Sequence, residues 1–172
     1  QRMHENADAK LSIARAAIPY LVPNTSIFLD AGTTVMSLVR QLPNQHYTIV
    51  TSGANIAIEL SQRSRSTVSC VGGQISSSTL SLSGPQAEAF LATVNIDTAV
   101  LAATGYSAGA GFTVGSYTEN SLKRRVIQKA DKVILLIDRS KLGRTLPFTF
   151  ASLSDIDVVI CDAPLPEDFI QA

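Results

Sequence analysis

Short runs of β-forming residues alternate with stretches of helical periodicity along this chain, and that alternation limits its fold more than any other feature. Two adjacent parallel strands need a long crossover between them, and the crossover is usually a helix. A chain that alternates in this way therefore forms a sheet with helices on its faces. The sequence predicts an α/β fold built on a mostly parallel sheet with crossover helices.

The clearest helix covers residues 117–130, where Leu122, Val126 and Ala130 recur at four-residue spacing. The other helices are expected at residues 6–21, 34–42, 54–64 and 86–93, and the strands at residues 26–30, 47–51, 67–71, 97–104, 132–138 and 157–161.

Three segments are less regular. Pro19 disturbs the end of the first helix, because proline has no N–H to donate. The Ser/Thr-rich residues 74–83 are expected to form an additional strand or an extended arm, and the glycine-rich residues 105–115 a loop. We find no internal repeat and no linker long enough to divide the chain, so residues 1–172 are expected to form one domain.

The composition favours a compact soluble protein, with 45% hydrophobic and 16% charged residues. Its 14 basic and 14 acidic residues cancel, and without a basic stripe these residues are poor candidates for contacting DNA phosphates. Residues 1–10 are polar, unlike a signal peptide, and they lack an initiator Met, which suggests a fragment or a processed chain. Because no apolar run approaches the roughly 20 residues of a membrane span, we expect a cytoplasmic location without membrane contact.

Neither a metal nor a cofactor is expected. Cys70 and Cys161 lie in apolar, strand-like runs without metal-ligand spacing, which predicts buried free thiols. His4 and His46 have no partner at such a spacing. No G-x-G-x-x-G follows a strand and there is no P-loop, which argues against a dinucleotide or nucleotide site.

Residues 30–34 (DAGTT) join the first strand to a helix, where open α/β sheets bind ligands. Gly32 lets the backbone approach a ligand closely. The hydroxyls of Thr33 and Thr34 lie beside the free N–H groups of the helix start, so Asp30 to Thr34 could hold an anion. The alternative is that one threonine only caps the helix.

The second strand ends in the same way, with Thr51, Ser52 and Gly53 before the next helix. Two hydroxyl-and-glycine turns at adjacent strand ends could line one crevice, which favours a ligand site over a helix cap.

Two further polar clusters allow both a structural and a functional interpretation. Ser116 and Glu119 fit a capping box, and Glu119 with Lys123 forms a favourable i,i+4 pair. Both side chains could equally face a ligand at the start of their helix. Asp138 and Lys141 directly follow the most hydrophobic strand, where they could contact a phosphorylated ligand or where Asp138 could cap a turn.

These clusters, in this order, resemble the C-terminal sensor domain of the DeoR family of bacterial sugar-metabolism regulators. The resemblance spans nearly the whole chain and rests on residues 28–34 (FLDAGTT), 48–51 (TIVT), 72–73 (GG), 82–85 (LSGP) and 138–141 (DRSK). The family commonly has Thr-Asn-Ser where this chain has Thr51, Ser52 and Gly53, which leaves the contacts of Ser52 open.

The resemblance implies a phosphorylated sugar as effector and self-association as a dimer or tetramer. It also implies DNA binding only through an N-terminal winged helix-turn-helix outside these residues. The expected effector contacts are Asp30, Gly32, Thr33, Thr34, Thr51, Ser52, Gly53, Gly73, Gly105, Tyr117, Glu119, Lys123 and Lys141.

The fold of this family is similar to that of ribose-5-phosphate isomerase, so an aldose–ketose enzyme is the main alternative. The isomerase needs a glutamate base, and counting back from Asp138 places Lys123 at that position. It also needs Asp and Lys at the end of a strand, where residues 101–106 here read LAATGY. A lysine cannot replace a carboxylate base in enediol chemistry. We therefore expect binding without catalysis, and a pure oligomerisation module is the third possibility.

Overall fold

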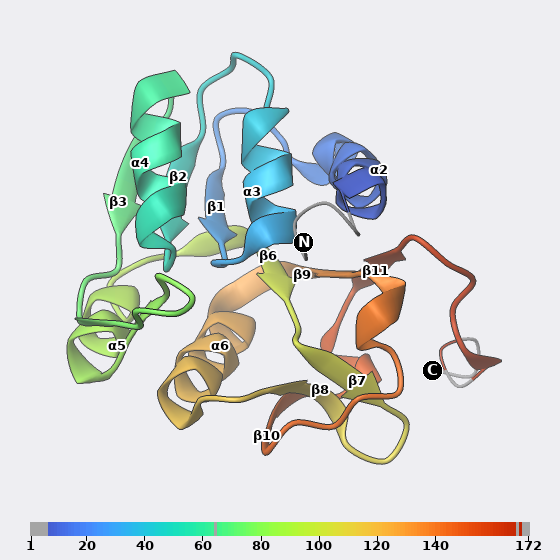
Figure 1. Ribbon diagram of the computed structural model, residues 1–172. Coiled ribbons are helices and arrows are strands. Elements are labelled where there is room, and N and C mark those ends of the chain that lie inside the picture. Colours follow the sequence, from blue (N-terminus) through green and yellow to red (C-terminus); the bar gives the residue numbers. More distant parts are fainter. Residues whose placement is uncertain (1–6, 64, 168, 170–172) are drawn as a thin grey trace.

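The computed structural model describes residues 7–63, 65–167 and 169. Its centre is a six-stranded parallel sheet in the order β11-β9-β6-β1-β2-β3, with helices on both faces (Figure 1). The predicted α/β fold with crossover helices is therefore confirmed. Within the described residues, no helix is both long and apolar enough to cross a membrane.

The sheet strands are β1 (Ser26–Leu29), β2 (Thr48–Thr51), β3 (Thr67–Cys70), β6 (Ile96–Ala102), β9 (Ala130–Ile137) and β11 (Val158–Cys161). The helices are α2 (Ala7–Ala17), α3 (Thr33–Arg40), α4 (Ala54–Arg63), α5 (Pro85–Leu91) and α6 (Tyr117–Lys129), and the 3-10 helices are η1 (Ile18–Tyr20), η2 (Arg139–Lys141) and η3 (Leu153–Asp155).

Side chains of each central strand alternate between two hydrophobic cores, because successive residues of a strand point to opposite faces. In β1, Ile27 and Leu29 join the core under α2, α3 and α4. Phe28 joins the core on the opposite face, together with side chains of α5 and α6. Both faces of the sheet are thus covered, which is why its strands are almost continuously apolar.

A second, antiparallel sheet of three strands extends the core under α6. It consists of β7 (Gly105–Ser107), β8 (Gly111–Val114) and β10 (Phe148–Ala151). The prediction of a loop at residues 105–115 was therefore wrong, and β10 was not foreseen. The glycines of this segment indicated a loop, but the segment forms a hairpin in which Phe112 and Val114 are buried. The arm predicted at residues 74–83 is also a hairpin, formed by β4 (Gln74–Ile75) and β5 (Leu82–Ser83).

The first helix is shorter than predicted, and Pro19 explains why. Helix α2 ends at Ala17, and Pro19 lies in η1, where its missing N–H breaks no α-helical hydrogen bond. The predicted start at Asn6 lies outside the described residues. Both cysteines are free but only half-buried, and the desolvation by this burial raises the pKa of the Cys70 and Cys161 thiols.

The strand order reverses between β1 and β6. From β1 the chain proceeds outward to β2 and β3, and it then returns to β6 on the other side of β1. Ligands of open α/β sheets bind outside the carboxyl ends of the strands at such a reversal. The register aligns Leu29 with Thr51 on one side and with Val100 on the other, so three strand ends meet there.

Gly105 tests the close contact between β7 and the chain after η2. A Cβ at this position would lie 2.6 Å from the carbonyl oxygen of Arg144, so Gly105→Ala is expected to lower stability by about 1–3 kcal/mol in chemical denaturation. Gly109→Ala is the matched control, because nothing lies within 4 Å of its Cβ. Equal stability of the two variants would contradict the close contact.

Candidate functional site

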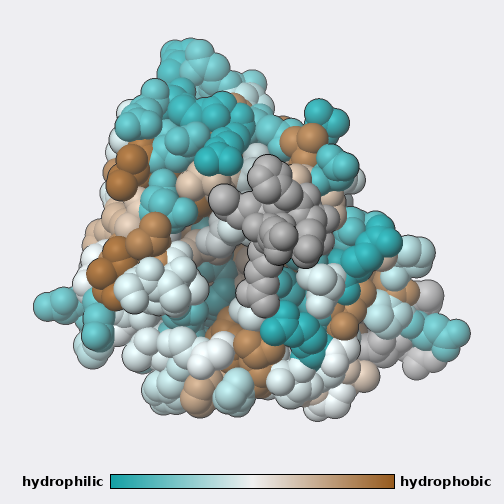
Figure 2. All heavy atoms as spheres, viewed as in Figure 1, coloured by the Kyte–Doolittle hydropathy of each residue, from teal (hydrophilic) through white to brown (hydrophobic). Residues whose placement is uncertain are grey.

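A polar cavity of about 210 Å³ lies at the carboxyl ends of β1, β6 and β9. The face drawn in Figure 2 is hollowed between the part that carries α3 and α4 and the part that carries α6, with hydrophilic residues at depth. The lining comes from distant parts of the sequence: the β1–α3 junction, the hairpin at residues 79–81, the ends of β6 and β9, and helices α2, α6 and η2. The cavity thus occupies the reversal point of the sheet.

The β1–α3 junction forms one wall. Gly32 has φ of 123° and no atom within 4 Å of where a Cβ would be, a backbone conformation that favours glycine. Helix α3 starts at the next residue without a side-chain cap, so the hydroxyls of Thr33 and Thr34 are not used for capping. The first N–H groups of a helix have no partner inside the helix and attract negative charge. This wall is suited to an anion.

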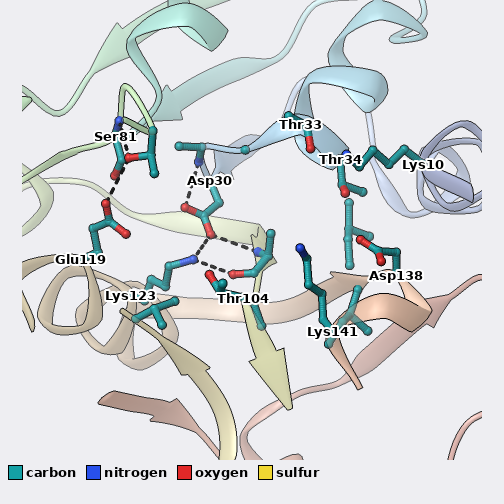
Figure 3. A pocket seen from close by; sticks show the side chains of 18 residues that line it. Lys10, Asp30, Thr33, Thr34, Ser81, Thr104, Glu119, Lys123, Asp138 and Lys141 are labelled. Atoms are coloured by element: carbon teal, nitrogen blue, oxygen red, sulfur yellow. Dashed lines mark hydrogen bonds and ion pairs between the residues drawn. The ribbon is translucent and has the colours of Figure 1, made fainter. Parts of the chain in front are cut away.

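The floor is formed by a buried ion pair between Asp30, after β1, and Lys123 of α6 (Figure 3). One Asp30 oxygen also accepts hydrogen bonds from the Ala31 N–H (2.8 Å) and the Ser52 hydroxyl (3.4 Å). The other accepts one from the Ala102 N–H (3.0 Å). The Lys123 ammonium donates a further hydrogen bond to the Ala102 carbonyl (2.6 Å). Asp30 and Lys123 therefore connect β1, β2, β6 and α6.

Glu119 faces the cavity rather than Lys123. Ser116 caps α6 by accepting a hydrogen bond from the Glu119 N–H (3.4 Å), so half of the predicted capping box is present. The Glu119 carboxylate instead accepts a hydrogen bond from the Thr79 hydroxyl (3.2 Å). The i,i+4 pair expected with Lys123 is replaced by the Asp30–Lys123 pair. The hairpin is thus attached to α6 at the rim of the cavity.

Helix η2 carries Lys141 to the opposite side of the cavity. Asp138 caps η2, since its carboxylate accepts hydrogen bonds from the Ser140 N–H (2.9 Å) and the Ser140 hydroxyl. Arg139 anchors the same helix through an ion pair with Asp162 (2.9 Å). Burial alone would raise the pKa of Asp162, but the hydrogen bonds from Arg139 outweigh it and the pKa is lowered.

Seven of the predicted contact residues line the cavity. They are Asp30, Gly32, Thr33, Thr34, Glu119, Lys123 and Lys141. The other six lie outside its lining: Thr51, Ser52, Gly53, Gly73, Gly105 and Tyr117.

Several of the residues outside the lining make contacts that stabilise the fold. Thr51 and Ser52 are buried, and their hydroxyls bond to the Gly53 N–H and to Asp30. A Cβ at Gly73 would lie 2.5 Å from the carbonyl oxygen of Ser83. Tyr117 is 66% exposed. The second hydroxyl turn thus supports Asp30 from behind the cavity.

Sequence reasoning missed Lys10, Thr79, Ser81 and Thr104, which also line the cavity. A signal existed for Lys10, because it shares one helix stripe with the buried Ile13, Ala14 and Ala17 at three-, four- and seven-residue spacing. No sequence pattern could place Thr79 and Ser81, since they reach the cavity only when their hairpin folds over the end of β2. Within the described residues, no group of His, Cys, Asp and Glu could hold a metal ion.

Comparison with known families assigns this architecture to a class of regulators. The model of the DeoR C-terminal sensor domain matches residues 5–163, so the chain belongs to this family. It is 36% identical over 169 residues to the "HTH-type transcriptional regulator GlpR" of Haloferax volcanii, a match that covers 98% of this chain and 66% of that protein.

A second relative is the "HTH-type transcriptional repressor GlcR" of Bacillus subtilis, which is 30% identical over 161 residues. That match covers 94% of this chain and 62% of the relative. The chain therefore spans about two thirds of the length of these regulators.

Among solved structures, the fold is similar to ribose 5-phosphate isomerase A from Methanocaldococcus jannaschii. The TM-score is 0.59 at 18% identity, and the match covers 82% of this chain and 56% of that one. The predicted likeness to the isomerase fold is confirmed.

Lys123→Met tests the buried ion pair. It leaves the Asp30 carboxylate buried without its cation, so the free energy of unfolding is expected to fall by about 3–5 kcal/mol. Asp30→Asn combined with Lys123→Met is expected to cost less than the sum of the single changes. Arg125→Met is the control on the same helix, because the Arg125–Glu88 pair is exposed and contributes about 1 kcal/mol or less. Additive effects of the two changes would contradict the coupling.

The Arg139–Asp162 pair predicts a pH dependence. Because the pKa of folded Asp162 lies below its ordinary value of 3.8, the pair stabilises the fold above that value. This stabilisation is lost as the pH falls through the lowered pKa. Asp162→Asn is therefore expected to reduce the melting temperature at pH 7 and to have little effect at the acid end. A constant difference across a pH series would contradict this assignment.

Proposed function

We propose that this chain is the effector-sensing domain of a DeoR-type transcription repressor of sugar metabolism, and that it binds a phosphorylated sugar in the cavity without converting it. The observation that carries the proposal is the two-sided chemistry of the cavity. Lys141 lies on the same side as the start of α3, where the Asp138 carboxylate is engaged by Ser140. The Glu119 carboxylate lies on the other side with Ser81 (Figure 3). A phosphorylated sugar has the complementary halves, an anionic end and a chain of hydroxyls.

The phosphate is assigned to the side of Gly32, Thr33 and Thr34. The start of α3 offers N–H groups and two hydroxyls, and Lys141 reaches into the same part of the cavity from η2. Helix N-termini bind phosphate through such N–H groups, and hydrogen bonds to a charged group are stronger than neutral ones.

The sugar hydroxyls are assigned to the side of Glu119. Its carboxylate accepts hydrogen bonds, and the hydroxyls of Thr79, Ser81 and Thr104 can both donate and accept them. Asp30 and Lys123 already bind each other beneath the sugar, so in this proposal they support the cavity, and Thr51 and Ser52 support Asp30 in turn.

The absence of turnover is proposed because the buried carboxylates are engaged in structural contacts. Asp30 accepts hydrogen bonds from four donors, and Asp138 caps η2. Glu119 is the observation that favours the enzyme as second candidate, because a carboxylate at the rim could act as a base. A coupled assay on pentose and hexose phosphates separates the two: any turnover that Glu119→Gln abolishes would overturn the proposal.

Effector binding would act on DNA through the rest of the longer protein. Relatives of this chain are named HTH-type regulators, and we assign DNA binding to an N-terminal winged helix-turn-helix beyond these residues. We further propose a cytoplasmic homo-oligomer, a dimer or a tetramer, with the chain as its effector-binding and oligomerisation domain. The effector can shift such an assembly only by binding its two arrangements with different affinities.

Thr33→Val combined with Thr34→Val tests the phosphate assignment, because valine keeps the shape and removes both hydroxyls. The Kd for phosphorylated sugars is expected to rise about 10-fold or more, since each lost hydrogen bond to a charged group costs about 1.5–3 kcal/mol. Binding of unphosphorylated sugars is expected to change little. Calorimetry against sugar phosphates chosen by a thermal-shift screen gives both values.

Thr48→Val is the matched control, because Thr48 is exposed at the far end of β2. If no phosphorylated sugar stabilises the unaltered chain, the sensor proposal fails and a pure oligomerisation module becomes the better interpretation.

A further inference from the structure

Lys10 is a mostly buried lysine whose ammonium opens to the cavity. It is only 9% exposed and belongs to the buried stripe of α2. Within the described residues, no carboxylate or carbonyl forms an ion pair or hydrogen bond with its ammonium. A cation that opens into a cavity without an opposite charge at ion-pair distance attracts anionic ligands. The missing counter-charge points to an anion that binds beside Lys10.

The side chain of Lys10 extends from α2 toward Thr34, at the phosphate side of the cavity (Figure 3). Lys10 and Thr33 also border a second space of about 580 Å³, a groove between the first part of α2 and helix α3. An anion at the start of α3 would therefore lie between Lys10 and the helix N–H groups.

The two halves of α2 differ in how firmly they are attached. Ile13, Ala14 and Ala17 are buried against the core in the second half. Among residues 7–12, only Lys10 is buried, and the groove separates this half from α3. A ligand that contacts both Lys10 and the start of α3 would thus hold the less buried first half of α2 against α3.

We propose that Lys10 binds the effector's phosphate and that this contact fixes the first half of α2 against α3 only when the effector is present. The inference rests on the proposed function and deepens it, because it names the element that responds to the ligand. Ligand binding would then change how firmly helix α2 is held, and α2 would transmit this change to the preceding part of the longer protein.

Lys10→Met keeps the length and the apolar stem of the side chain and removes its charge. Without ligand, the variant is expected to melt at nearly the same temperature, because methionine keeps the buried stem and Lys10 has no ion pair to lose within the described residues. The Kd for the phosphorylated sugar with the largest thermal shift is expected to rise about 10- to 100-fold. Affinity for inorganic phosphate is expected to fall as well. Lys10→Arg is expected to restore most of the affinity for both the phosphorylated sugar and inorganic phosphate.

Hydrogen exchange tests the response of α2. At saturating sugar phosphate, peptides of α2 in the unaltered chain are expected to gain protection from hydrogen exchange. Arg15→Met is the control, because it removes a charge from the exposed side of the same helix, and it is expected to gain the same protection. Lys141→Met is expected to bind more weakly but to keep this protection at saturation. Lys10→Met is expected to lose it even when saturated.

The outcomes separate the two proposals. If the unaltered chain binds a sugar phosphate and Lys10→Met binds it equally well, Lys10 is a lysine with a buried stem and a hydrated ammonium, and the inference is overturned. Equal protection of α2 in both chains overturns it too. If no sugar phosphate binds the unaltered chain, the proposed function itself fails. Should Lys10→Met not fold, Lys10→Gln provides the same comparison.

Discussion

The Asp30–Lys123 ion pair is the interaction on which the cavity depends. It lies where the strand order reverses, and its two side chains connect the ends of β1 and β6, the turn after β2, and helix α6. Because both charges are buried, each would be costly without the other. The parallel register brings Asp30 level with Ser52 and within one residue of Ala102, so the ends of the sheet strands supply two of the donors to the carboxylate. The fold and the site therefore stabilise each other.

This pair also bears on the proposal that a fold similar to that of an isomerase here serves binding. The lysine at position 123 neutralises Asp30 and donates to a backbone carbonyl, and the ring of Phe150 lies beneath it at 5.0 Å. Both groups are engaged with each other in the structure, and this engagement supports the proposal that the cavity binds a ligand without converting it. In the proposed function, the polar groups that remain accessible at the rim bind the effector, its phosphate near the start of α3 and its hydroxyls near Glu119.

The sequence was sufficient to predict the parallel sheet, because buried strands and crossover helices have local patterns of their own. It failed at residues 105–115, where glycines indicated a loop, since the burial of Phe112 depends on a partner strand that starts at Phe148. The end of β1 was predictable as the wall of a cavity, because open α/β sheets have their crevice at the carboxyl ends of strands, and Gly32, Thr33 and Thr34 do line the cavity. Thr79 reaches the cavity because its hairpin packs beside α6, where the Thr79 hydroxyl donates to Glu119, and no local sequence pattern predicts a contact over 40 residues.

Lys10 shows how a conflict between pattern and chemistry can locate function. Its position in the helix stripe calls for an apolar side chain, and an apolar residue there would avoid the cost of burying a charge. A lysine at such a position buries its stem and places its ammonium at the cavity, where an anion can bind it. A ligand that does so binds more tightly, and by linkage the helix is held more firmly when the ligand is bound. In the proposed function, the charge of Lys10 couples the cavity to the first helix.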